Sequence, residues 1–164
     1  MDAELPRPTL GLTIATHVFL GLLFVAGLGT IALLPSFAAP AAEALPEYAE
    51  LQVPLLATSI ALTALGLIAI AMIALLVARV YSATILTRSS ILWVDVIITV
   101  LVCAALLLIT AFFTISGAQA GSPAIAIALV IACLALIALA CITLVLRSLL
   151  SGAILMRTEL DEVV

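Results

Sequence analysis

Charged residues are scarce in this chain. They make up 9% of its 164 residues, whereas a typical soluble domain carries about 25%. Lysine is absent, so all five basic residues are arginine. Apolar residues make up 67% of the chain, which leaves too little polar surface to cover a soluble particle. The composition therefore predicts an integral membrane protein.

The same scarcity excludes several classes of protein. Five basic residues and a net charge of −4 argue against nucleic-acid binding, which needs a basic surface. The three cysteines lie inside apolar runs and form no Cys-x-x-Cys motif, so neither a disulfide scaffold nor a thiol oxidoreductase is expected. No hydrolase, zinc-protease or phosphate-loop motif is present. We therefore expect a non-enzymatic protein with no catalytic residue, metal or cofactor.

Long apolar runs dominate what remains. A hydrocarbon core of about 30 Å is crossed by about 20 apolar residues of helix. Four runs are long enough: 9–34, 53–78, 91–115 and 123–146. They predict an all-α fold, a single integral membrane four-helix bundle (1–164) with up-down-up-down topology and a C-terminal tail (147–164). Pro35 follows the first run and is expected to end that helix.

The arginines predict the orientation of these spans. With four spans, the segments that carry arginine all face the same side: Arg7, Arg79, Arg88, Arg147 and Arg157. The loops on the opposite side contain no basic residue. Cytoplasmic loops are enriched in arginine and lysine, so both termini are predicted to be cytoplasmic.

The first apolar run has a second interpretation, as a secretory signal peptide with a small-residue cleavage site at 37–39 or 39–41. Signal peptides have an apolar stretch of about 7–15 residues after a basic start. Here the run covers about 26 residues, and Asp2, Glu4 and Arg7 precede it. We therefore expect the first helix to be retained.

His17 and Asp95 are the ionisable residues within the predicted spans, and such residues are costly in lipid and often functional. A functional interpretation makes them a proton-responsive polar site. In the structural interpretation, which we favour, His17 bonds a neighbouring carbonyl and Asp95 pairs with Arg79, Arg88 or Arg147. The three arginines are also candidate contacts for lipid phosphates at the inner face.

Small residues recur at helical spacing within the spans. In lipid, such residues let helix backbones approach closely. They support either a compact bundle or self-association of the chain, and a homo-oligomer remains an alternative. The positions concerned are Gly21, Gly27, Gly29, Ala57, Ala61, Ala124, Ala128, Ala132 and Ala140.

The segment 77–96, VARVYSATILTRSSILWVDV, resembles the cytoplasmic loop of a bacterial family of four-helix membrane proteins, domain of unknown function 2975. The family's glycine falls near Ala83 and its phenylalanine at Leu86, so both hallmark residues differ here. The ending ELDEVV (159–164) is similar to the acidic and apolar ending of that family. The four-span layout matches over nearly the whole chain. The resemblance implies a bacterial inner-membrane protein, in some members encoded beside a small helix-turn-helix regulator, and brings no catalytic residues.

Two functions follow as expectations. The first is an accessory or sensor subunit that binds membrane lipids or a protein partner through the loop 79–90 or the tail 147–164. The tail is favoured for a protein partner because its acidic end does not favour an anionic leaflet. The alternative is a small transporter or channel subunit with a polar path near His17 and Asp95.

Overall fold

The computed structural model describes residues 10–44, 49–81, 88–118 and 122–161, which form four helices. They are α1 (Leu10–Ala44), α2 (Gln52–Tyr81), α3 (Arg88–Gly117) and α4 (Pro123–Asp161). Each helix contains an apolar stretch long enough to cross a membrane, and no strand occurs in these ranges. The prediction of an all-α membrane fold with four spanning helices is confirmed.

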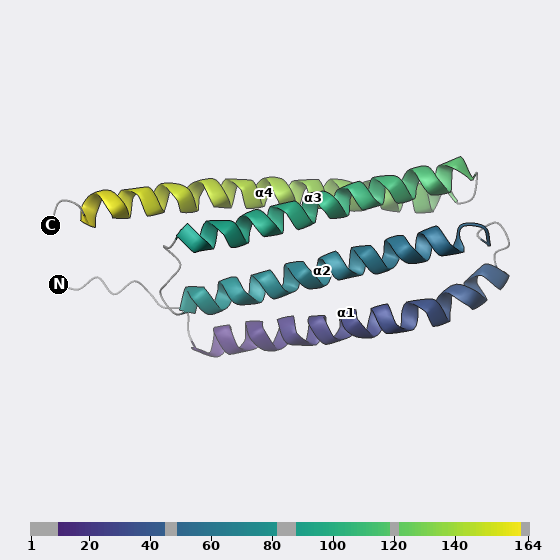
Figure 1. Cartoon of the computed structure of the whole chain (residues 1–164), viewed down its shortest axis with the longest axis horizontal. Helices are drawn as coiled ribbons and strands as arrows, with labels where there is room; N and C mark the ends of the chain where they lie inside the picture. The colour runs from purple at the N-terminus through teal and green to yellow at the C-terminus, as the bar shows by residue number, and fades with distance from the viewer. Residues whose placement is uncertain (1–9, 45–48, 82–87, 119–121, 162–164) are drawn as a thin grey trace.

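The helices form an open row in chain order. Figure 1 shows that consecutive helices run in opposite directions, so the start of α1 lies at the same end as the end of α4. Within the described ranges, substantial contacts join α1 to α2, α2 to α3 and α3 to α4. The two outer helices, α1 and α4, therefore lie at the edges of the row, and each has one packing partner.

The core lies around α3, the helix with a neighbour on both sides. Of the most apolar stretch of α3, 33% of residues are buried, against 0% for α1 and 6% for α2 and α4. Val94 is the most buried large side chain. Three of the other buried residues of α3 are alanines, Ala104, Ala105 and Ala111. Small side chains permit close helix approach in lipid, so these alanines explain how α3 fits between two helices.

Some of the other small residues pack against a neighbouring helix, whereas others are exposed. Ala140 of α4 is buried, whereas the remaining alanines of its predicted stripe, Ala124, Ala128 and Ala132, are exposed. Gly27 of α1 lies directly against Leu67 of α2. Gly21 and Gly29, by contrast, have no atom within 4 Å of a side-chain position. Most of the predicted small-residue faces therefore take no part in packing within the described chain.

Prolines mark the beginning of two helices. Pro123 is the first residue of α4 and Pro54 is the third residue of α2. A missing N–H costs least in the first turn of a helix, and the fixed φ of proline suits it. The carbonyl of Ser122 accepts a hydrogen bond from the backbone N–H of Ile125 at 3.0 Å, which completes the first turn of α4.

The predicted end of the first helix at Pro35 is wrong. Helix α1 continues through Pro35 and Pro40 to Ala44. The residues around the two prolines are rich in alanine, the strongest helix former. In a membrane, a helix also pairs backbone groups that would otherwise lack partners. Figure 1 shows α1 bending toward this end, as expected where proline removes a helix hydrogen bond.

The fourth helix is also longer than its apolar run. It has 39 residues and continues to Asp161, well beyond the predicted span boundary at 146. At 1.5 Å per residue its length is about 58 Å, nearly twice the thickness of a hydrocarbon core of about 30 Å. Most of the predicted tail is therefore a continuation of α4.

Candidate functional site

One ion pair joins α3 to α4. Asp95 lies in the second turn of α3, and the antiparallel arrangement places it beside the later part of α4, which carries Arg147. Nε of Arg147 donates to Oδ1 of Asp95, and Nη2 donates to Oδ2 at 3.2 Å. Both carboxylate oxygens are therefore engaged by one guanidinium, the geometry in which arginine binds carboxylates most strongly. Of the three arginines considered for Asp95, Arg147 is the one whose side chain the structure describes, and it pairs with Asp95.

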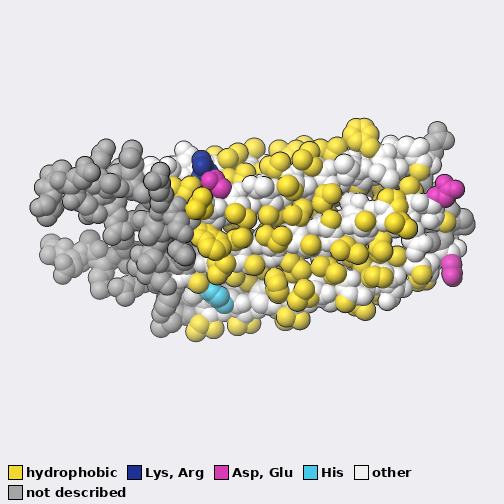
Figure 2. Space-filling view, in the orientation of Figure 1, with side chains coloured by type: hydrophobic (Ala, Val, Ile, Leu, Met, Phe, Trp, Pro, Cys, Tyr) yellow, Lys and Arg dark blue, Asp and Glu magenta, His cyan; other side chains and the backbone are white. Residues whose placement is uncertain are grey.

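The pair lies near one end of the candidate spans, because Asp95 is close to the start of Ile91–Gly117 and Arg147 is close to the end of Pro123–Gly152. Figure 2 shows an acidic and a basic side chain in contact toward one end of the described part of the molecule, with other acidic side chains at the opposite end. The side chains of Arg147 and Asp95 are 43% and 40% exposed. Two opposite charges that neutralise each other at such a boundary avoid the cost of a lone charge near lipid. The arrangement accounts for Asp95 as a structural link between two helices.

His17 is held by its own helix. Its Nδ1 donates to the backbone carbonyl of Thr13, one turn earlier in α1, at 3.0 Å. Helix α1, which carries His17, packs on α2, whereas Asp95 lies on α3. Helices α1 and α3 make no substantial contact within the described ranges. His17 and Asp95 therefore do not form one polar site in this structure.

Several hydroxyl side chains within the spans of α2, α3 and α4 bond their own helices. In each case the hydroxyl donates to a backbone carbonyl three or four residues earlier, at 2.8 to 2.9 Å. This local bonding satisfies a hydroxyl without a polar cavity. The residues are Thr58, Ser59, Thr63, Thr99, Thr110, Thr114 and Thr143.

Arg79 and Arg88 can be placed only by the backbone. Arg79 lies near the end of α2 and Arg88 is the first residue of α3, and these ends meet at the same end of the row as Arg147 (Figure 1). Their side chains lie outside the described part of the structure, as does Arg7. Their predicted contacts with lipid phosphates stay a prediction. For Arg147, two guanidinium nitrogens are already engaged by Asp95.

The described residues hold no group of three or more His, Cys, Asp or Glu side chains placed to bind a metal ion. Cys103, Cys133 and Cys141 are free thiols. Cys103 and Cys141 are exposed, whereas Cys133 is half-buried between α3 and α4.

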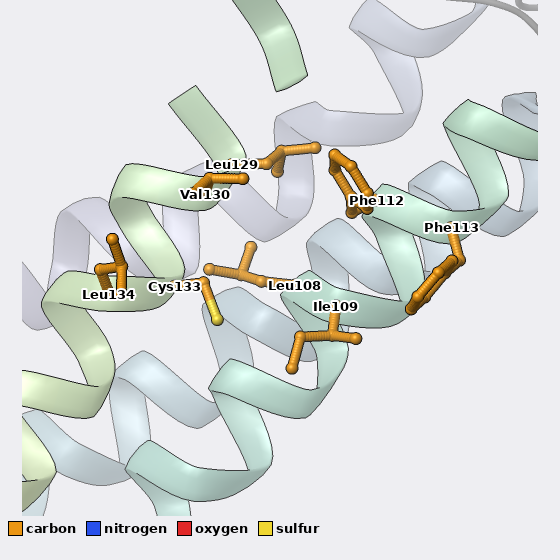
Figure 3. A pocket seen from close by; sticks show the side chains of 8 residues that line it. All are labelled: Leu108, Ile109, Phe112, Phe113, Leu129, Val130, Cys133 and Leu134. Atoms are coloured by element: carbon orange, nitrogen blue, oxygen red, sulfur yellow. The ribbon is translucent and has the colours of Figure 1, made fainter. Parts of the chain in front are cut away.

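An apolar groove lies between α3 and α4, toward the end opposite the ion pair. Its volume is about 240 Å³, and no polar atom lines it. Figure 3 shows side chains of both helices around it, with Leu108 pointing toward Cys133. The rings of Phe112 and Phe113 pack edge to face at one end, with centroids 5.9 Å apart and planes at 76°. No pattern in the sequence marks this groove, because every residue type in it also occurs on lipid-facing positions.

The comparisons with known proteins place the chain in a family. The profile of a family described as "Protein of unknown function (DUF2975)" matches residues 36–164, the last part of α1 and the whole of α2, α3 and α4. No curated protein and no solved structure matches the chain. The matched region contains both members of the ion pair and the groove. The match covers more than three-quarters of the chain, and the chain therefore belongs to this family of unknown function, as the segment 77–96 and the four spans had indicated.

Proposed function

We propose that this chain is a small, non-enzymatic membrane subunit that binds a protein partner through the projecting end of α4. The observation that carries the proposal is the continuity of α4 beyond the ion pair. Asp161 lies 14 residues after Arg147 on the same helix. At 1.5 Å per residue, about 21 Å of helix extends past the level of that pair. Residues 153–161, about 14 Å of this helix, lie beyond the candidate spanning stretch Pro123–Gly152.

The chemistry of this extension favours a protein over a lipid surface. Its last turns contain Glu159 and Asp161, and the chain continues with Glu162. An anionic leaflet repels such a cluster of carboxylates. A helix that leaves the membrane with an acidic end is suited to a partner that presents basic or neutral polar groups. The ion pair between Asp95 and Arg147 ties the base of the extension to α3.

The proposal includes the orientation of the four helices across the membrane. The helix ends that carry arginine gather at one end of the row, whereas Glu43 and Glu50 are exposed at the other. The positive-inside rule favours a cytoplasmic position for the extension of α4. The resemblance of segment 77–96 to a bacterial membrane family supports the inner membrane of a bacterial cell as the location. A partner would therefore be a cytoplasmic protein or the cytoplasmic part of another membrane protein.

Photocrosslinking in the source membrane tests this assignment. A photoreactive amino acid at Leu155 or Leu160 of the extension is expected to capture a discrete protein partner. The same amino acid at Ala118, at the opposite end of the row, is the matched control. A variant that lacks 158–164 but retains the four spans is expected to lose the partner. Equal capture at both ends of the row, or unchanged capture by the shortened variant, would contradict the proposal.

A flux assay separates this proposal from the transporter alternative. The purified chain in liposomes is expected to carry no current and no proton or cation flux above that of empty vesicles, at any pH between 5 and 8. Flux that is abolished by Asp95→Asn or His17→Ala would establish a polar path and replace the binding role. These two variants are informative because both side chains lie within or beside the spans.

A further inference from the structure

The groove between α3 and α4 lies entirely at the depth of lipid chains. Its lining residues fall within the spanning stretches Ile91–Gly117 of α3 and Pro123–Gly152 of α4. Leu108 lies 13 residues after Asp95, and Cys133 lies 14 residues before Arg147. At 1.5 Å per residue, the groove therefore begins about 20 Å from the level of the ion pair. In a hydrocarbon core of about 30 Å, this is the leaflet opposite the arginine-bearing end.

The groove has a buried base and an exposed rim. Leu108 is 8% exposed and Cys133 is half-buried, so both lie at the base. Phe113 and Val130 are exposed and form the rim. A side chain that is exposed at this depth faces lipid rather than water. The groove is therefore open sideways, toward the surrounding acyl chains.

The lining restricts the occupant to a hydrocarbon. No polar atom lines the groove, so a polar or charged ligand would lose its hydrogen bonds to water without replacement. A cavity of about 150 Å³ lined by leucine, isoleucine and phenylalanine accepts a benzene ring, so 240 Å³ accommodates a segment of a flexible chain. A helix of a second copy is too wide to enter, because a helix with side chains is about 10–12 Å across.

We propose that this groove holds one acyl chain of a membrane lipid from the leaflet opposite the arginine-bearing end. The chain packs against Leu108 and Cys133 between the two helices, with Phe113 and Val130 beside it. This site is separate from the proposed partner contact, since it lies on the other half of α4. Either proposal can fail without the other.

Photolabelling with lipids tests the groove in the full-length protein. The protein is reconstituted in phosphatidylcholine bilayers that contain a small fraction of phosphatidylcholine with a diazirine on one acyl chain. In one lipid the diazirine is near the ester, and in the other it is at the terminal methyl. Irradiation, proteolysis and mass spectrometry then locate the adducts. We expect adducts to concentrate on 108–113 and 129–134, and the probe near the ester to label these segments several-fold more than the terminal probe.

Two substitutions on adjacent residues of α4 supply the matched comparison. Val130→Trp fills the groove from its rim, whereas Ile131→Trp places the same side chain on a residue that is 61% exposed and does not line the groove. The first is expected to reduce groove adducts several-fold and the second to leave them unchanged. Helix content and elution volume confirm that both variants are folded.

Several results would overturn the proposal. One is an even distribution of adducts over the groove and over other lipid-facing segments such as 141–146. Another is equal labelling by both tryptophan variants. A third is crosslinking of the groove to a second copy of the chain in place of lipid. The comparison of the groove with other lipid-facing segments uses the unaltered protein, so it still tests the proposal if Val130→Trp does not fold.

Discussion

The contact between Gly27 and Leu67 allows a quantitative test of how α1 packs on α2. A methyl group built on Gly27 would lie 2.6 Å from Cδ2 of Leu67 and 3.3 Å from its Cγ. Real carbon–carbon contacts have their optimum at about 3.5–4.0 Å, so Leu67 must move by about 1 Å to accept the methyl group. Leu67 is only 8% exposed, which leaves its side chain little room to move. Gly27→Ala is therefore expected to weaken the packing of α1.

The magnitude follows from two opposing contributions. Overpacking of a well-packed site costs about 1–3 kcal/mol. Replacing a helical glycine by alanine contributes about 0.8–1.0 kcal/mol of helix propensity in the opposite direction. Gly29→Ala provides the propensity without the clash, because nothing lies within 4 Å of its side-chain position. The free energy of unfolding of Gly27→Ala is expected to be about 1–3 kcal/mol lower than that of Gly29→Ala.

Titration with sodium dodecyl sulfate, followed by circular dichroism in mixed micelles, measures this difference. A double-mutant cycle with Leu67→Ala identifies its source, because removing the leucine methyls abolishes the clash. In the Leu67→Ala background, Gly27→Ala is expected to be neutral or stabilising. Equal stability of the two glycine variants, or the same cost of Gly27→Ala in both backgrounds, would refute the reasoning.

The remaining predictions concern the ion pair, the bend of α1 and the orientation. Asp95→Arg and Arg147→Asp are each expected to lower the thermal unfolding temperature, and the double variant is expected to recover most of the loss; single variants as stable as the parent would show that the pair contributes nothing. Pro35→Ala is expected to raise the detergent concentration that unfolds the protein by restoring a helix hydrogen bond, and Pro40→Ala, nearer the helix end, to have a smaller effect. In a background without the native cysteines, Glu50→Cys is expected to react with an impermeant maleimide added to intact cells. Protection of that thiol would contradict cytoplasmic termini.

The number and approximate positions of the spans could be predicted because hydrocarbon thickness sets their length. The third predicted span, 91–115, agrees with the observed stretch Ile91–Gly117 to within two residues. The end of the first helix could not be predicted in the same way. Proline usually ends helices in water, whereas α1 passes through Pro35 in a segment whose alanines and membrane surroundings favour helix.

The face of each helix that packs against its neighbours could not be predicted from the sequence. In water the buried face of a helix is apolar and the outer face polar, but in lipid both faces are apolar. Ala124, Ala128 and Ala132 therefore have the same pattern as packing residues and yet are exposed. The buried Ala104 and Ala111 lie seven residues apart on α3, and the sequence alone does not distinguish them from the exposed alanines of α4. The arginine that pairs with Asp95 could not be predicted from the sequence either, because several arginines belong to the same end of the protein.

The row of helices in chain order has a consequence for biosynthesis. Each helix packs on the one that precedes or follows it in the chain, so the contacts of the described residues join segments that are close in sequence. Such a protein has a low contact order, and its loop-closure entropy is correspondingly small. Helix α2 meets its partner α1 as soon as it is synthesised, and α4 completes a hairpin with α3. The chain can therefore enter the bilayer and assemble pair by pair as it emerges from the ribosome, without any helix waiting for a distant partner.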